Sequence, residues 1–317
     1  MNFNALFSDF GGYTITGLTV GAIYALVALG YTLVYGVLRL INFAHSEVFI
    51  AGAFAAIWGW AALGLGRDSV ATGFGSILLY LLVGALIAAA ASAATATVVE
   101  RVAYRPLRKR NAPPLAFLIT AIGASIAIAE AFGIYTRRLP VGAPTIVRPD
   151  LVLFEVAGTE VTMVQVLVIV SALAMMVALD LFINRSRIGR GIRAVAQDQN
   201  TAALMGINKD RIILVVFIIG GVMAGVAGML YDIRIGTLTY SVGFLLGLKA
   251  FTAAVLGGIG NLRGALVGGL LLGLVENYAS ALFGANWKDL VAFVVLVVLL
   301  MFRPTGLLGE SLGRARA

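Results

Sequence analysis

Long apolar runs alternate with short polar stretches along nearly the whole chain. A helix needs about 20 predominantly apolar residues to span a bilayer, and nine runs reach or approach that length. The runs are Tyr13–Leu38, Val48–Leu65, Phe74–Val99, Leu115–Tyr135, Met163–Ile183, Ile212–Tyr231, Phe244–Gly260, Gly264–Phe283 and Leu290–Phe302. The pattern predicts an all-α polytopic membrane protein with eight or nine transmembrane helices, some of them broken or re-entrant.

Composition supports the membrane class and narrows the chemistry. The 317 residues are 61% hydrophobic and 12% charged, whereas soluble proteins carry roughly 25% charged residues. The chain has no cysteine and one histidine, so a disulfide framework, thiolate chemistry and a His or Cys metal site are excluded. We expect no cofactor.

Basic residues indicate the orientation of the helices. The formal net charge is +8, and most Lys and Arg residues lie in loops between the apolar runs. Two basic loops, 101–110 and 184–211, are placed in the cytoplasm by the positive-inside rule. The tail with Arg303, Arg314 and Arg316 is then cytoplasmic and the N-terminus external. No exposed aromatics interleave with these cations, which argues against a nucleic-acid partner.

We expect one transmembrane permease-type domain over 1–317. Loop 136–162 should be external, and loop 184–211 cytoplasmic. Within the external loop, Leu151–Val156 and Thr159–Thr162 flank Ala157 and Gly158. Short β-prone runs on either side of a glycine turn predict a small external β-hairpin.

Two polar stretches interrupt the apolar pattern. The first holds Asn42, His45, Ser46 and Glu47, and the second, Gly236–Gly243, holds Thr237, Tyr240 and Ser241. Each precedes a helix rich in Ala and Gly. In transporters, helices broken at corresponding places in two halves mark the substrate route.

We therefore take these seven side chains as translocation-pathway candidates. We expect Asn42–Glu47 to interrupt helical structure within the membrane and to face a subunit interface beside the second break. The alternative is a short cytoplasmic turn capped by Ser46.

Two charges fall inside apolar runs. Lys249 and Glu276 lie at similar depths on neighbouring antiparallel helices, so we expect them to pair directly or through water, because an unpaired charge there is costly. Alternatively, Lys249 extends outward to the interface. A proton-coupled carrier using Glu130, Lys249 and Glu276 is a competing function, and an enzyme using His45 with Glu47 as an acid–base pair is a weaker one.

The chain resembles the LivH family, the permease subunits of branched-chain amino acid ABC importers. The stretches that carry the resemblance are 21–31 (GAIYALVALGY), 35–45 (YGVLRLINFAH), 193–198 (RAVAQD) with 204–207 (LMGI), and 247–251 (GLKAF) with 253–260 (AAVLGGIG). Ser46 departs from the glycine usual in relatives. The resemblance implies a bacterial plasma-membrane importer with a second homologous permease, two cytoplasmic ATPase subunits, an external substrate-binding protein and lipid contacts.

What the resemblance implies agrees with the absence of a phosphate-binding Gly-x-x-x-x-Gly-Lys-Ser/Thr loop from the sequence. We therefore expect a non-catalytic subunit whose energy comes from the ATPase partners. Leucine, isoleucine and valine are the expected substrates, and urea or short amides are the alternative.

One cytoplasmic segment resembles the coupling helix of ABC importers. Asn200 is a reasonable N-cap and Gly206 a reasonable stop for a short helix over Thr201–Met205. The alternative is a solvated basic loop that only sets topology. The coupling candidates are Arg190, Arg193, Asp198, Ala202, Ala203, Leu204 and Gly206.

Overall fold

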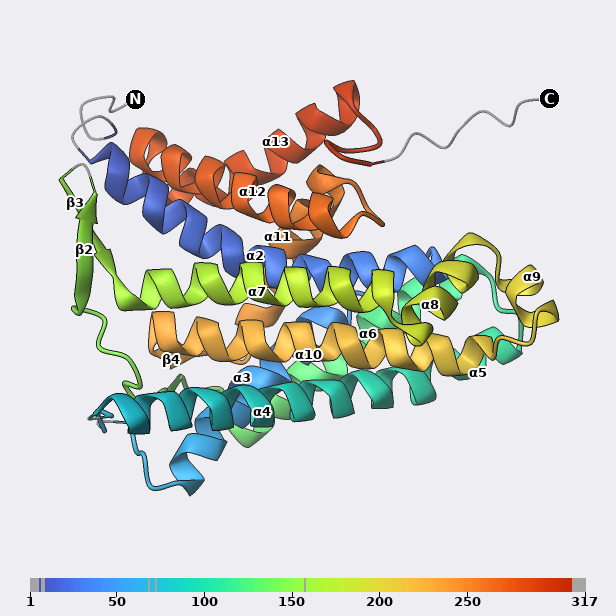
Figure 1. The fold of residues 1–317 in the computed structure, drawn as a ribbon, viewed down its shortest axis with the longest axis horizontal. Helices are drawn as coiled ribbons and strands as arrows, with labels where there is room; N and C mark the ends of the chain where they lie inside the picture. Colours follow the sequence, from blue (N-terminus) through green and yellow to red (C-terminus); the bar gives the residue numbers. More distant parts are fainter. Residues whose placement is uncertain (1–5, 7–8, 68, 72, 157, 310–317) are drawn as a thin grey trace.

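A computed structural model describes residues 6, 9–67, 69–71, 73–156 and 158–309. Its long helices lie side by side in one bundle (Figure 1). The principal helices are α2 Phe10–Leu38, α3 His45–Ala62, α4 Phe74–Val98, α6 Pro114–Tyr135, α7 Met163–Arg185, α10 Lys209–Ile235, α11 Val242–Gly257, α12 Leu262–Phe283 and α13 Lys288–Phe302. Each of the nine apolar runs forms one of these helices.

Short elements gather at the two ends of the bundle. They are the π-helix η1 Val99–Tyr104, α5 Arg105–Lys109, α8 Arg187–Gln197, α9 Gln199–Leu204, the 3₁₀-helix η2 Ala285–Trp287, and the strands β1 Val141–Gly142, β2 Val152–Val156, β3 Thr159–Thr162 and β4 Thr237–Leu238. Figure 1 shows β2 and β3 at one end, the hairpin end, and α8 and α9 at the other, the α8–α9 end.

Seven helical segments within the described residues are long and apolar enough to cross a membrane. The two principal helices outside this set, α3 and α11, are 18 and 16 residues long. The chain is therefore mostly helical and multi-pass.

The strands form two separate antiparallel pairs, β1 with β4 and β2 with β3. In the second pair, Val156 lies opposite Thr159 and Glu155 opposite Glu160, as a hairpin across positions 157–158 requires. Ala157 lies outside the described residues, so the turn itself is not described. Arg314 and Arg316 of the predicted cytoplasmic tail also lie outside the described residues.

Helix α2 is the centre of the bundle. It packs against α12, α10, α11 and α7, and its middle from Ala22 to Leu29 is almost fully buried. Close approach to α12 depends on glycines, because a methyl group at Gly273 would lie 2.5 Å from the Cα of Gly21. Helices α4 and α13 instead expose leucine and valine side chains, as a lipid-facing surface requires.

Candidate functional site

The first polar stretch contains a break in the helix, but the break lies earlier than expected. Helix α2 ends where Arg39 adopts a left-handed conformation with φ 57°, and residues 39–44 are non-helical. Helix α3 begins at His45. The prediction that His45, Ser46 and Glu47 interrupt the helix is therefore wrong; they form the first turn of α3. Ser46 caps no helix, since its hydroxyl donates to the carbonyl of Phe43 at 2.8 Å.

The six-residue break reverses the chain and returns it to the interior of the bundle. The end of α2 lies beside α8 and α9, where Gln199 Nε2 donates to the carbonyl of Val37 at 2.9 Å. The His45 imidazole nevertheless lies against Gly30, which is about 12 Å back along α2 at 1.5 Å per residue. Helix α3 therefore begins deep within the bundle.

Helix α11 begins at a similar depth but runs in the opposite direction. It follows α10, which ends at Ile235, and residues 236–241 are non-helical except for strand β4. A methyl group at Gly243 would meet Ile50 and Glu47, and one at Gly247 would meet Ser46. The N-terminal turns of α3 and α11 therefore meet inside the bundle, although the two breaks that precede them lead in from opposite ends.

The first group of pathway candidates is enclosed by this chain. Asn42, His45, Ser46 and Glu47 are only 1–3% exposed. The expectation that they face a subunit interface is therefore wrong, because α2, α6, α10 and α11 already surround them. Asn42 Oδ1 accepts a hydrogen bond from Tyr104 at 3.1 Å.

Glu47 and His45 retain unused polar atoms in this enclosed region. Glu47 Oε1 accepts from Ser125 at 3.3 Å and from Ser46 at 3.4 Å. Glu47 Oε2 and His45 Nε2 are buried without a hydrogen-bond partner among the described residues. The two side chains do not hydrogen bond to each other, so the arrangement offers no acid–base pair.

The second group of candidates divides between two places. Thr237 lies in β4 opposite Gly142, and the ring of Tyr240 faces Gly133 and lies 6.0 Å from the Arg138 guanidinium. Ser241 instead lines a cavity that also holds Lys249 and Glu276. Only Ser241 of this group joins a candidate binding space.

Lys249 and Glu276 form the expected ion pair. Their Nζ and Oε1 atoms are 2.6 Å apart, and their side chains are 6% and 4% exposed. Glu276 Oε2 accepts from the Tyr24 hydroxyl at 2.8 Å. Lys249 also lies 2.5 Å from Asp289 of α13, and Lys288 lies 3.9 Å from Glu276. The pair is thus part of a network that joins four helices.

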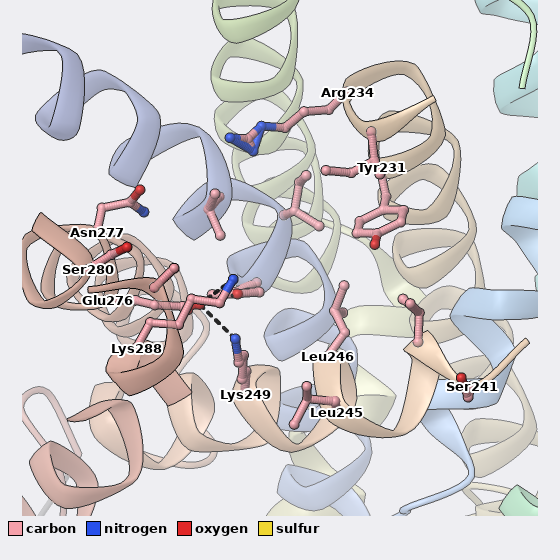
Figure 2. A pocket seen from close by; sticks show the side chains of 16 residues that line it. Tyr231, Arg234, Ser241, Leu245, Leu246, Lys249, Glu276, Asn277, Ser280 and Lys288 are labelled. Carbon is pink, nitrogen blue, oxygen red and sulfur yellow. Dashed lines mark hydrogen bonds and ion pairs between the residues drawn. The ribbon is translucent and has the colours of Figure 1, made fainter. Parts of the chain in front are cut away.

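The network borders a cavity of about 500 Å³ near the hairpin end of the bundle. Figure 2 shows Arg234 and Tyr231 entering it from α10, Lys249 and Leu245 from α11, and Glu276 from α12. The apolar part of the wall consists of Val20, Ile23, Ile235, Val242, Leu245, Leu246 and Ala285. A concave apolar space with a few convergent polar groups is typical of a small-molecule site.

Sequence reasoning missed Tyr24, Arg234, Lys288 and Asp289. Arg234 carried a usable signal, because a lone arginine at the outer end of a run departs from the positive-inside pattern. Lys288 and Asp289 precede the apolar run predicted from Leu290, but α13 begins at Lys288. Glu130 pairs with Arg138 at 2.7 Å and contacts neither Lys249 nor Glu276, so the proton relay has no continuous route.

The short helix in loop 184–211 is present with different limits. It runs over Gln199–Leu204, and its N-cap is Asp198 rather than Asn200. The Asp198 carboxylate accepts from the backbone N–H groups of Thr201 and Asn200, which hold the pKa of this carboxyl below its ordinary value. Gly206 follows the helix with φ +83°, a conformation that favours glycine as a stop.

The coupling candidates differ in how far they are exposed to a partner. Leu204 and Met205 are 88% and 79% exposed, whereas Ala202 is 4% exposed and cannot contact a partner. Ala203 and Gly206 are exposed. Arg190 and Arg193 lie in α8, and Arg193 donates to the carbonyl of Ile183, so Arg193 anchors α8 to α7 rather than orienting α9.

Two helices of 18 and 16 residues that start inside the bundle, α3 and α11, together with a charged cavity beside α11, are typical of a transporter-type membrane protein. The model of the family described as branched-chain amino acid transport system / permease component matches residues 13–300. The chain belongs to this family.

Individual relatives match over almost the full length. The chain is 42% identical to the high-affinity branched-chain amino acid transport system permease protein BraD of Pseudomonas aeruginosa, over 93% of this chain and 94% of BraD. It is also 42% identical to the corresponding permease LivH of Escherichia coli K12, with the same coverage. A probable LivH of Methanocaldococcus jannaschii is 25% identical over 90% of this chain and 88% of that protein.

Proposed function

We propose that this chain is a permease subunit of an ATP-driven importer for leucine, isoleucine and valine in the bacterial inner membrane. The observation that carries the proposal is the 42% identity, over 93% of the chain, to permeases named for branched-chain amino acids. A second homologous permease, two cytoplasmic ATPase subunits and an external binding protein complete the importer. This chain forms part of the path, and the ATPases hydrolyse ATP.

The proposed orientation puts the α8–α9 end in the cytoplasm and the hairpin end outside. The arginines and lysines of loops 101–110 and 184–211 support it through the positive-inside rule. With α3 and α11 counted as the two broken segments, the chain makes eight or nine crossings, with an external N-terminus and a cytoplasmic C-terminus. Loop 136–162, including the hairpin, is then external, and the exposed apolar sides of α4 and α13 contact lipid.

The proposed path passes the meeting point of α3 and α11. Asn42, His45, Ser46 and Glu47 line its inner wall from within this subunit, and Thr237, Tyr240 and Ser241 lie toward its outer mouth. Glu47 and His45 support this role because each keeps a polar atom without a partner among the described residues. Such unused groups in a buried region are costly and are retained where function needs them.

We further propose that α9 docks on an ATPase subunit. An exposed Leu204 and Met205 on a protruding helix are costly in water and suit an apolar groove on a partner, while Ala203 and Gly206 leave room for that partner's surface. Arg190 and Asp198 flank the contact.

Cross-linking tests the docking. The chain has no natural cysteine, so Leu204→Cys should cross-link to the ATPase subunit in the assembled importer. A matched Leu153→Cys on β2, 49% exposed at the opposite end, should not. Normal coupled transport with Gly206 and Ala203 both replaced by leucine would show that the contact lies elsewhere.

Uptake tests the substrate assignment. Cells that carry the complete importer should accumulate labelled leucine, and cells that lack it, or that carry an inactive ATPase subunit, should not. Accumulation of labelled urea instead would support the short-amide alternative. Leucine uptake that persists without the ATPases would support the proton-coupled carrier.

A further inference from the structure

We propose that the cavity between α2, α10, α11 and α12 binds the charged backbone of a zwitterionic aliphatic amino acid during its passage. In this site the ligand carboxylate contacts Arg234 and Lys288, the ligand ammonium contacts Glu276, and the aliphatic side chain contacts Leu245 and Leu246. This inference rests on the proposed function, and it assigns recognition to a place in the permease itself.

The carboxylate half follows from two cations that lack a close acidic partner. Lys288 reaches Glu276 only at 3.9 Å, and its side chain is 46% exposed. Arg234 lines the cavity and makes no hydrogen bond or ion pair with any other described residue. Figure 2 shows its guanidinium extending from α10 toward the cavity. A guanidinium without a carboxylate, beside a small-molecule cavity, is suited to bind one bidentately.

The ammonium half follows from the way in which Lys249 is held. Glu276 accepts from Tyr24 and Lys249, and in the proposed site the incoming ammonium takes the place of Lys249. Lys249 can leave Glu276 without becoming an unpaired buried charge, because Asp289 lies 2.5 Å from its Nζ. Entry of the ligand then exchanges one cation for another at Glu276 and leaves both Glu276 and Lys249 paired.

The charges of the cavity favour a zwitterion over a neutral ligand. Three cations line it (Arg234, Lys249 and Lys288), against the carboxylate of Glu276, while Asp289 pairs with Lys249. A zwitterion can therefore place its carboxylate beside Arg234 and Lys288 and its ammonium beside Glu276. Urea carries no charge and can form neither of these ion pairs.

The remaining wall suits a branched aliphatic side chain. Leu245, Leu246, Val20 and Ile23 present only carbon atoms from their side chains, and the volume of about 500 Å³ falls within the range of small-molecule pockets. Burial of a leucine or isoleucine side chain there contributes affinity without requiring a shape-specific pocket. Moderate affinity is what a permease needs, because it must also release the ligand.

The test measures protection of an introduced cysteine in the whole importer. Leu245→Cys, in a chain that is naturally free of cysteine, is reconstituted with its partner permease and ATPases in nanodiscs, without the binding protein. Reaction of this cysteine with neutral methyl methanethiosulfonate is followed by mass spectrometry of this chain. Leu153→Cys on β2 is the control and should react at one rate under all conditions.

Leucine should slow the reaction of Leu245→Cys in a saturable manner, and urea should have no effect. 4-Methylpentanoate is leucine without the ammonium and isopentylamine is leucine without the carboxylate, so each loses a charged hydrogen bond. Half-maximal protection should therefore need about tenfold more of either analogue than of leucine.

Two further substitutions test the carboxylate contact and the ammonium contact of the ligand separately. Lys288→Gln, at a half-exposed position that does not threaten folding, should weaken leucine and 4-methylpentanoate and leave isopentylamine unchanged, so that the advantage of leucine over isopentylamine narrows while Arg234 keeps part of it. Glu276→Gln should weaken leucine and isopentylamine and leave 4-methylpentanoate unchanged, so that the advantage of leucine over 4-methylpentanoate narrows. A merely structural role for either residue would weaken all ligands by the same factor, and that result would overturn the assignment.

The failure of this inference is distinguishable from failure of the proposed function. If the intact importer accumulates leucine but leucine gives no protection, or urea protects equally, the site is wrong and the function stands. If phosphoethanolamine protects as well as leucine, the cavity binds a lipid headgroup and the inference is overturned. If leucine protects the cysteine but the intact importer accumulates no leucine, the site stands and the transport function fails.

Discussion

The ion-pair network gives the sharpest prediction about stability. Glu276→Gln removes one partner of Lys249, whose side chain is 6% exposed. Breaking a buried pair from one side costs about 3–5 kcal/mol when the remaining charge has no other partner. Here Asp289 remains 2.5 Å from Lys249, so we expect the single variant to lose only about 1–3 kcal/mol.

The second acid can be removed as well. Asp289 is 38% exposed, so Asp289→Asn alone should cost about 1 kcal/mol. The double variant Glu276→Gln/Asp289→Asn leaves Lys249 without any carboxylate and should approach about 3–5 kcal/mol, which is at or beyond the sum of the two singles. Restoring neutrality with Lys249→Met in the double variant should recover most of this loss.

The measurement is denaturant unfolding of the purified subunit in one detergent, followed by tryptophan fluorescence. Glu130→Gln is the matched control, since its pair with Arg138 is 44% and 62% exposed and should contribute about 0–1 kcal/mol. Equal losses for Glu130→Gln and Glu276→Gln, or no recovery with Lys249→Met, would refute the argument that burial gives the network its importance.

Three other positions give shorter tests. Gly273→Ala should destabilise by about 1–3 kcal/mol because its methyl group would meet the backbone of α2, whereas Gly123→Ala meets nothing within 4 Å and should be neutral or stabilising in the same unfolding assay. Asp198→Ala should abolish amide hydrogen-exchange protection at the start of α9 at neutral pH and Asp198→Asn should retain much of it. The pKa of Asp198 is lowered in the folded protein. The wild-type cap is therefore complete above the ordinary pKa of the carboxyl and is lost as the pH falls through the lowered value. Unchanged protection in Asp198→Ala would contradict the role of Asp198 as the cap. His45→Ala should reduce leucine uptake more than it reduces the amount of assembled importer on blue native gels, and equal reductions would make His45 structural.

The ends of the helices show where local pattern stops being informative. The run at Val48 was expected to start after a polar break, yet α3 takes in His45, Ser46 and Glu47. Polar residues suit the first turn of a helix, because its N–H groups have no intrahelical partners and Glu47 is favoured by the positive end of the dipole. Polarity alone therefore could not separate a break from a helix start. The same ambiguity explains why Asn200 was the predicted N-cap of α9, whereas the structure has Asp198 in that position.

The sequence by itself determined the helical runs and one long-range contact. Apolar length and the spacing of polar interruptions are local properties, and a bilayer requires each spanning run to satisfy its own backbone. Lys249 and Glu276 could be paired in advance because a short turn joins their helices, so helical rise alone sets their relative depth.

Tertiary structure alone decided which residues surround that pair and which become enclosed. Tyr24 of α2 and Asp289 of α13 contact the ion pair, and Arg234 of α10 lines the adjoining cavity. The spacing of apolar residues along the chain does not indicate which helix faces meet. His45 and Glu47 became internal because the chain reverses at residues 39–44 and packs α3 against α2 and α10. Such packing depends on the shapes of several helices at once, and close approach at glycines such as Gly273 selects one arrangement.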